Sequence, residues 1–212
     1  MKSACVHLCR FRLWVGLVLL SIPGGCGPGG RNQPELEFQP PELASEVKTV
    51  LEKKTALVEE LAGDERILAA VRAANAERSR LSNRDIASMD TRWKAAEATV
   101  DFVKPFLTSP CARALGAFQE AHDEFPEILV TDARGLIVAA TNKSSDFLQA
   151  DEAWWVETFK RGGRGGWTGP IEYDESTGSE AISVYVPLID AKDAVIGVIK
   201  AVCDLNAIKR EL

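Results

Sequence analysis

The chain has 212 residues, of which 46% are hydrophobic and 26% are charged, and its formal net charge is −6. These proportions are typical of a globular protein of about one domain, and they exclude a largely disordered or fibrous chain. The lysines and arginines form no block, which disfavours nucleic acid as a partner. Two histidines and five scattered cysteines offer little material for a metal site.

Residues 1–25 have the composition of an export signal. Three basic residues and no acidic residue precede an apolar run of ten residues, 13–22. A membrane-spanning helix needs about 20 apolar residues, so this run is too short to cross a bilayer. Its length and flanks instead fit the apolar part of a signal peptide.

Small residues follow that run and lead to Cys26. The segment resembles a bacterial lipoprotein signal peptide, in which this cysteine is lipidated and becomes the first residue of the mature protein. The resemblance implies lipidation of Cys26 and an extracytoplasmic, periplasmic-side location in the cell envelope. Because Gly27 rather than Asp follows, we expect the outer membrane. The alternatives are an ordinary secretory signal with a stray cysteine, or a short membrane anchor.

A flexible tether and a helical region are expected next. Residues 26–41 are rich in Gly and Pro and lack periodicity, which is typical of a linker. Residues 42–125 show apolar side chains at helical spacing. This spacing predicts helices over 42–60, 64–80, 82–102 and 106–118, with breaks at Pro105 and Pro110. Asp64 and either Ser82 or Asn83 are suited to cap two of them, and breaks come too often for a coiled coil.

From residue 126 the pattern changes to that of β-strands. Strands are predicted over 128–131, 136–141, 168–173, 181–189 and 194–203, with one helix over 151–160 inserted between the second and third. Asp132 begins a segment with tight-turn composition, and the links between the last three strands suit antiparallel hairpins. The fold class is therefore α+β, with helices covering a five-stranded antiparallel sheet.

Four stretches of this region carry a family resemblance. They are EILVTDARGLIVAATN (127–142), SSDFLQADEAWW (144–155), GPIEYDESTGSEAISVYVPLID (169–190) and AVIGVIKAVCDL (194–205). In order and spacing they resemble a Cache (PAS-like, PDC-type) extracellular sensor domain. The resemblance implies a PAS-like sheet domain over 126–212, preceded by a long N-terminal helical layer. It also implies a pocket for a small metabolite on one sheet face, closed by the inserted helix and the glycine-rich loop 162–166.

Cache domains sit outside membrane receptors and drive kinases, cyclases or chemotaxis modules. Only seven residues follow Leu205 in this sequence, so we expect the signal to pass to a partner protein such as a membrane receptor or kinase. The sequence thus predicts a lipid-anchored sensor or ligand-binding module, with a homodimer through the N-terminal helix. The alternative is a structural or protein-interaction envelope lipoprotein with a filled pocket.

Two tryptophans and one tyrosine are candidates for the aromatic wall of that pocket. Trp154 and Trp155 are adjacent on the inserted helix. Because helix neighbours point about 100° apart, we expect only one of them to face the sheet. Tyr173 ends the third strand beside the glycine-rich loop, where its hydroxyl would orient a ligand. The alternative is that these aromatic side chains belong to the core or to the sheet edge.

Three polar candidates lie on the last two strands. Ser183 and Tyr185 alternate with apolar residues and therefore share one face of their strand. Lys200 interrupts the apolar run VIGVIKAVC, and buried lysines are rare unless they are paired. As a ligand contact, Lys200 would select a carboxylate. The alternative is a lysine that extends along the strand to water.

Enzymatic activity is not predicted. The sequence has no GxSxG, HExxH, P-loop or CxxC motif, and His122 is the single histidine after the export signal. No nucleophile, base and orienting group can be named together, and no cofactor or metal is expected. Beyond Cys26 the chain keeps Cys111 and Cys203, for which two free buried thiols are favoured over one disulfide.

Overall fold

The computed structural model describes residues 43–160, 167–174 and 179–212. The predicted boundaries at residues 25 and 41, Cys26 and the loop 162–166 lie outside these ranges. The helices are α1 (Ser45–Ala62), α2 (Glu65–Arg78), α3 (Asn83–Ala95), α4 (Lys104–Thr108), α5 (Pro110–Ala121), α6 (Ala153–Lys160) and α7 (Leu205–Arg210). The strands are β1 (Glu127–Asp132), β2 (Ile137–Ala140), β3 (Trp167–Asp174), β4 (Ser179–Ile189) and β5 (Val195–Asp204). None of the described helices is both long and apolar enough to cross a membrane.

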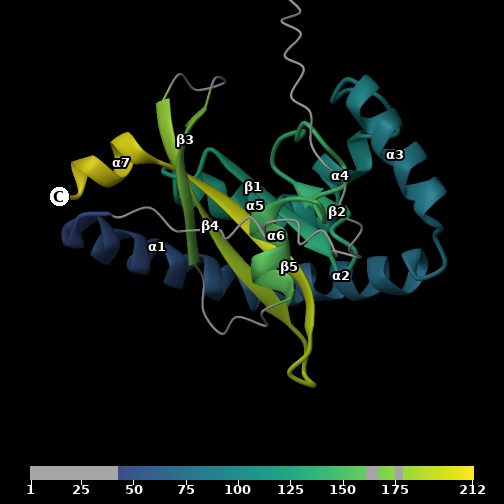
Figure 1. Ribbon diagram of the computed structural model, residues 1–212, viewed down its shortest axis with the longest axis horizontal. Coiled ribbons are helices and arrows are strands. Elements are labelled where there is room, and N and C mark those ends of the chain that lie inside the picture. Colours follow the sequence, from purple (N-terminus) through teal and green to yellow (C-terminus); the bar gives the residue numbers. More distant parts are fainter. Residues whose placement is uncertain (1–42, 161–166, 175–178) are drawn as a thin grey trace, which may run out of the picture. The chain divides into compact units, whose positions relative to one another are not determined.

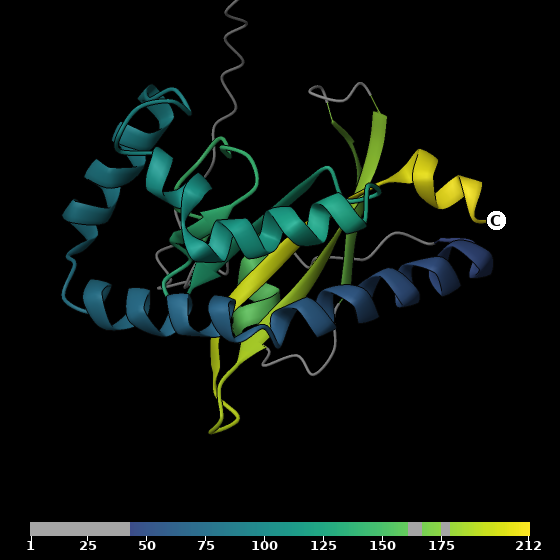
Figure 2. The same cartoon turned by 180° about the vertical axis from the view of Figure 1, so that it is seen from behind.

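The five strands form one antiparallel sheet in the order β2-β1-β5-β4-β3, with β2 and β3 at its edges. The predicted fold class is therefore confirmed. Figure 1 views the sheet from the side of α6, and Figure 2 views it from behind, where α1, α2 and α5 cross the other face. The sheet is thus covered by helices on both sides, and an apolar cluster lies on each face.

The face under α1, α2 and α5 carries the larger apolar core. Alternate residues of β4, including Ile182 and Val184, pack there against Val58 of α1 and Leu115 of α5. Residues from both the predicted helical region and the predicted sheet region contribute to this core. Burial of these apolar side chains, at about 25 cal/mol per Å² removed from water, is the main force that holds the helices on the sheet.

A second apolar cluster extends from β2 and the loop that follows it to Trp154 and Tyr185 under α6. Trp93 of α3 is fully buried and contacts the rings of Phe102, Phe106 and Phe147 at centroid distances of 6.3, 5.4 and 5.4 Å. Its indole Nε1 donates a hydrogen bond to the Ser144 carbonyl at 2.9 Å. These contacts fix α3, α4 and the 143–150 loop to one end of the sheet.

Two helix boundaries differ from the sequence prediction. The third helix ends at Ala95 instead of continuing toward residue 102, because Ala96 adopts an extended conformation. The predicted break at Pro110 is confirmed, because two helices meet at Ser109, whose side chain caps α5, whereas Pro105 lies inside the first turn of α4. Helix α7 was not predicted, although Asp204 before it accepts a hydrogen bond from the backbone of Asn206 as an N-cap does.

Ion pairs connect α1 to the end of the chain. The Lys54 ammonium lies 2.7 Å from a carboxylate oxygen of Glu124 and 2.6 Å from one of Glu211. Lys54 and Glu124 are both largely shielded from water. Although burial alone would raise it, the hydrogen bond from Lys54 holds the pKa of Glu124 below its ordinary value. This cluster joins α1, the segment before β1 and the residue after α7.

Candidate functional site

The face of the sheet under α6 carries most of the predicted site residues. Ser183 and Tyr185 point to this side of β4, because their neighbours Ile182 and Val184 are in the core on the other side. Lys200 of β5 is directly opposite Tyr185 in the strand register. The structure therefore brings three residues from two strands together beneath helix α6.

Trp154 of α6 lies over these strands. Its ring is stacked on that of Tyr185, with a centroid distance of 5.0 Å and an interplanar angle of 8°. The exposed fractions are 6% for Trp154 and 2% for Tyr185. The Lys200 ammonium is 5.6 Å from the centre of the Trp154 ring, which is within the range of a cation–π interaction. We call Trp154, Tyr185, Ser183 and Lys200 the α6-facing site.

Burial dominates the electrostatics of this site. It raises the pKa of the Tyr185 hydroxyl, and a hydrogen bond with Ser183 opposes part of that shift. The pKa of Glu152, just before α6, is also raised, first by loss of water around it and then by the charge of Asp151, while Lys200 acts in the opposite direction. At neutral pH the Tyr185 hydroxyl is therefore protonated and able to donate a hydrogen bond.

Trp155 is held by a different strand from Trp154. Its indole Nε1 donates a hydrogen bond of 3.0 Å to the Thr131 hydroxyl of β1, and its ring is stacked on Phe159 at 4.6 Å. The expectation that only one tryptophan faces the sheet is wrong, because both are buried and each contacts a strand. Helix α6 lies across the strands, so side chains about 100° apart reach β4 and β1 respectively.

Tyr173 lies apart from the other candidates. Its exposed fraction is 66%, and in the strand register it is opposite Glu180, on the same face as Ile182. The β3–β4 register shifts between Thr168 and Ile171, and a one-residue shift moves every later side chain to the other face. Tyr173 therefore points to the α1 side of the sheet, away from Tyr185.

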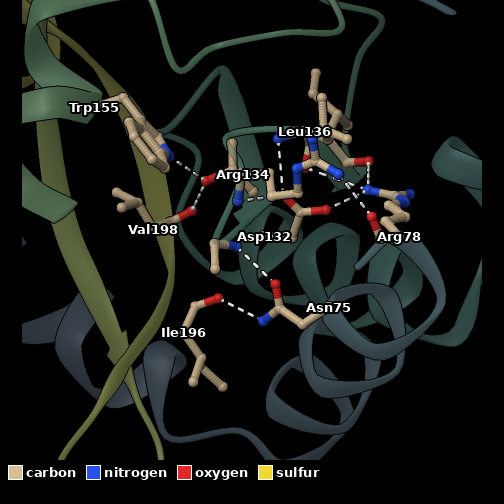
Figure 3. A network of polar contacts seen from close by, with 11 residues as sticks. Asn75, Arg78, Asp132, Arg134, Leu136, Trp155, Ile196 and Val198 are labelled. Atoms are coloured by element: carbon tan, nitrogen blue, oxygen red, sulfur yellow. Dashed lines mark hydrogen bonds and ion pairs between the residues drawn. The ribbon is translucent and has the colours of Figure 1, made fainter. Parts of the chain in front are cut away.

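A buried polar network adjoins the site at the end of β1 (Figure 3). Asp132 is fully buried and its Oδ1 accepts hydrogen bonds from the backbone N–H groups of Arg134 and Leu136 at 2.9 and 3.0 Å. Gly135 completes the turn at a φ of 70°, a conformation that glycine adopts without strain. The predicted turn at Asp132 is confirmed.

Asp132 is also paired with an arginine that is distant in the sequence. Its Oδ2 accepts a hydrogen bond of 2.9 Å from Arg78 Nη1. Arg78 Nη1 also lies 3.0 Å from the carbonyl of Ile137, and its guanidinium lies over the Phe106 and Phe147 rings. Arg78 and Asp132 are 54 positions apart, which no local pattern reveals.

Surface hollows of the described residues lie away from α6. One, of about 430 Å³, is bounded by the end of α1, the start of α2 and one side of α5, and includes Leu57, Arg66, Phe118 and His122. The thiols of Cys111 and Cys203 are free and buried in the core, as expected. Burial raises the pKa of the Cys111 thiol to about 12.

Comparisons with known proteins give structural similarity alone. No protein-family model and no curated protein matches the chain. It is similar to the sensor domain of the V. cholerae histidine kinase DctB, with 16% identity, a TM-score of 0.44, and coverage of 78% of this chain and 53% of the other. The ligand-binding domain of the Campylobacter jejuni chemoreceptor Tlp3, in complex with 4-methylisoleucine, has 14% identity, a TM-score of 0.40 and coverage of 79% and 63%.

A third similar structure is the ligand-binding domain of the Pseudomonas aeruginosa PAO1 amino acid chemoreceptor PctC in complex with GABA. Its identity is 16%, its TM-score 0.39, and the coverage is 77% of this chain and 61% of the other. The chain spans about half to just under two thirds of these three proteins. All three are sensor domains of histidine kinases or chemoreceptors, and at these values the likeness assigns no ligand and no partner to this chain.

Proposed function

We propose that the protein is an extracytoplasmic sensor module that binds a small metabolite at the α6-facing site and passes the signal to a partner protein. The observation that carries this proposal is the Trp154–Tyr185 stack with Lys200 beside it. Aromatic surfaces with a few converging polar groups are typical of small-molecule sites. The Lys200 ammonium and the hydroxyls of Ser183 and Tyr185 would orient the ligand.

The Lys200 ammonium favours a ligand that carries a carboxylate. Lys200 is half-buried, and a carboxylate would be a stronger partner for its ammonium than an aromatic ring. The flat Trp154 face would contact the apolar part of the same molecule. Such a ligand would bind by moving α6 slightly or by displacing the Trp154 ring from Tyr185.

The burial of the aromatic side chains also favours a second candidate. Trp154, Trp155 and Tyr185 fill the space between α6 and the sheet with one another. A sheet face filled in this way suits a structural or protein-interaction lipoprotein that keeps the sensor fold without a ligand. This candidate predicts a stable protein partner and no response to metabolites.

A thermal-shift screen separates the two candidates. The purified full-length chain would be melted with amino acids, other carboxylates, amines, purines and sugars. A ligand at a hundredfold excess over its dissociation constant stabilises a protein by about 2.7 kcal/mol. A saturable shift that is lost in Lys200→Met but kept in Lys192→Met, a lysine in the β4–β5 turn, supports the sensor. A cooperative melt with no shift supports the interaction protein.

The membrane anchor is a separate part of the proposal. We propose that lipidation of Cys26 holds the protein on the periplasmic side of the cell envelope, at the outer membrane. The matched variants are Cys26→Ser and Cys9→Ser, because both cysteines lie in the N-terminal segment. Release of the Cys26→Ser chain alone from the membrane fraction is expected. Equal membrane retention of both variants would refute lipidation at this position.

The partner side of the proposal includes a receptor or kinase and a second copy of the chain that pairs through α1. Sedimentation of the purified chain tests the homodimer, and a concentration-independent monomer would refute it. Cross-linking in cells, followed by identification of the linked protein, tests the receptor or kinase partner. If the chain is recovered without a cross-linked receptor or kinase, the result would count against signal transfer to such a partner.

A further inference from the structure

Strand β1 ends in two buried side chains that point in opposite directions. Thr131 and Asp132 are adjacent, and both are fully buried. Successive residues of a strand face opposite sides of the sheet, so Thr131 faces α6 and Asp132 faces α2. The last two residues of β1 are therefore in contact with both layers of helices.

On the α6 side, Thr131 is part of a short hydrogen-bonded chain. Its hydroxyl accepts a hydrogen bond from Trp155 Nε1 at 3.0 Å and donates one to the carbonyl of Val198 at 3.3 Å. If α6 moved away from the sheet, the buried indole N–H and the hydroxyl would lose a partner. Unpaired buried polar groups are costly, so the position of α6 is fixed to this residue.

On the α2 side, the turn after Asp132 is attached to the helix by side chains (Figure 3). Asn75 Oδ1 accepts a hydrogen bond from the backbone of Ala133 at 2.9 Å, and its Nδ2 donates to the carbonyl of Ile196 at 2.8 Å. One helix turn later, Arg78 donates to Asp132. Helix α2 is thus attached to β1, to the turn and to β5 at the same level as the Trp155–Thr131 contact.

Close backbone packing makes this junction stiff. Gly197 of β5 is opposite Asp132 in the register. A Cβ atom added there would lie 2.1 Å from the Thr131 carbonyl oxygen and 3.1 Å from a methyl group of Val71 in α2. The strands and α2 therefore have no space in which to absorb a displacement of β1 locally, and packed interiors transmit strain.

From these contacts we propose that the end of strand β1 is a coupling element that transmits displacement of helix α6 to helix α2. It would carry a change at the α6-facing site to the opposite layer of the protein. The coupling is a property of the ligand-free chain and does not depend on the proposed ligand. The coupling can therefore be tested whether or not the proposed sensor function is correct.

Hydrogen exchange of the purified full-length chain tests the coupling. Thr131→Val keeps the shape of the side chain but removes the hydroxyl. Loss of one such hydrogen bond is expected to speed amide exchange about fivefold in α6 and, through the coupling, in α2. Exchange in α1 should not change. Trp155→Phe removes the donor from the other side and should give the same pattern.

The matched control for Thr131→Val is Thr141→Val. The Thr141 hydroxyl contacts the backbone of Ile128 at the other end of β1, and this variant should leave α6 and α2 at the wild-type rates. Faster exchange in α6 with an unchanged α2 would overturn the coupling. Equal acceleration in α1 would also overturn it, because the effect would then be a general loss of stability.

Coupling between two elements is reciprocal, which gives a second test from the α2 side. Asn75→Ala should speed exchange in α6 by a similar factor, although the hydrogen bonds of Asn75 go to the β1–β2 turn and to β5. The control is Glu77→Ala, on the exposed side of α2, which should not affect α6. Wild-type exchange of α6 in Asn75→Ala would refute the proposal.

Discussion

The replacement of Arg78 by methionine tests the buried ion pair at the centre of the fold. Arg78 is 12% exposed and Asp132 is fully buried, so Arg78→Met leaves the Asp132 carboxylate without its cationic partner. Removal of one member of a buried pair costs about 3–5 kcal/mol. Loss of the bond to the Ile137 carbonyl and of the contacts with Phe106 and Phe147 acts in the same direction.

Urea unfolding measures this cost. With an m-value of about 2 kcal/mol/M, the midpoint should fall by about 1.5–2.5 M. The control is Arg72→Met, on the same helix, whose partner Glu65 is exposed. Exposed pairs contribute about 0–1 kcal/mol, so this variant should change the midpoint little.

A double variant separates the charge from the packing. Asp132→Asn keeps an oxygen for the two turn N–H groups and removes the negative charge. The Arg78→Met/Asp132→Asn chain should therefore be at least about 1 kcal/mol more stable than Arg78→Met alone. A loss below about 0.5 kcal/mol in Arg78→Met would refute the reasoning. A double variant less stable than the single one would also contradict it.

Three further predictions concern other parts of the chain. Lys54 lowers the pKa of Glu124, so the stability that the ionised Glu124 carboxylate contributes is full above pH 4.5 and is lost as the pH falls. The difference in unfolding free energy between wild type and Glu124→Gln should therefore become smaller in acid, and a difference that does not depend on pH would contradict this. In Gly197→Ala the added Cβ would meet the Thr131 carbonyl, so this variant should destabilise the protein by about 1–3 kcal/mol or more. Gly116 has open space around it, so Gly116→Ala should stabilise the protein by about 0.5–1 kcal/mol. Chemical unfolding measures both changes, and equal effects of the two variants would refute the packing argument. Because burial raises the pKa of Cys111 to about 12, the Cys111 thiol should resist alkylation at pH 8 until the protein is unfolded. Rapid alkylation of Cys111 in the folded protein would contradict its burial.

Local patterns were sufficient to predict the five strands and the hairpins between neighbouring strands, but not the pairing of β1 with β5. Period-two alternation in β4 separated Ser183 and Tyr185 from the core residues Ile182 and Val184. The Asp at position 132, followed by a glycine, marked the β1–β2 turn. Such signals depend on residues that are near in sequence, which is why the fold class and most strand boundaries followed from them.

The errors arose where tertiary structure changes a local pattern. Tyr173 was a candidate because it ends the third strand beside the glycine-rich loop, but the register shift in β3 turns its side chain to the face opposite Tyr185. The dipeptide Gly169-Pro170 within the strand was a signal of such a bulge. The contacts of Asp132 with Arg78 and of Trp155 with Thr131 join distant segments, and no periodicity in the sequence reports on them.

The most direct test of the α6-facing site is the affinity, by calorimetric titration, of the compound that gives the largest thermal shift. The wild-type chain would be compared with Trp154→Phe and with Phe118→Leu, which alters the hollow beside α5. Weaker binding by tenfold or more in Trp154→Phe, with wild-type affinity in Phe118→Leu, is the predicted result. Unchanged affinity in Trp154→Phe, or a loss confined to Phe118→Leu, would place the ligand elsewhere and contradict the proposed site.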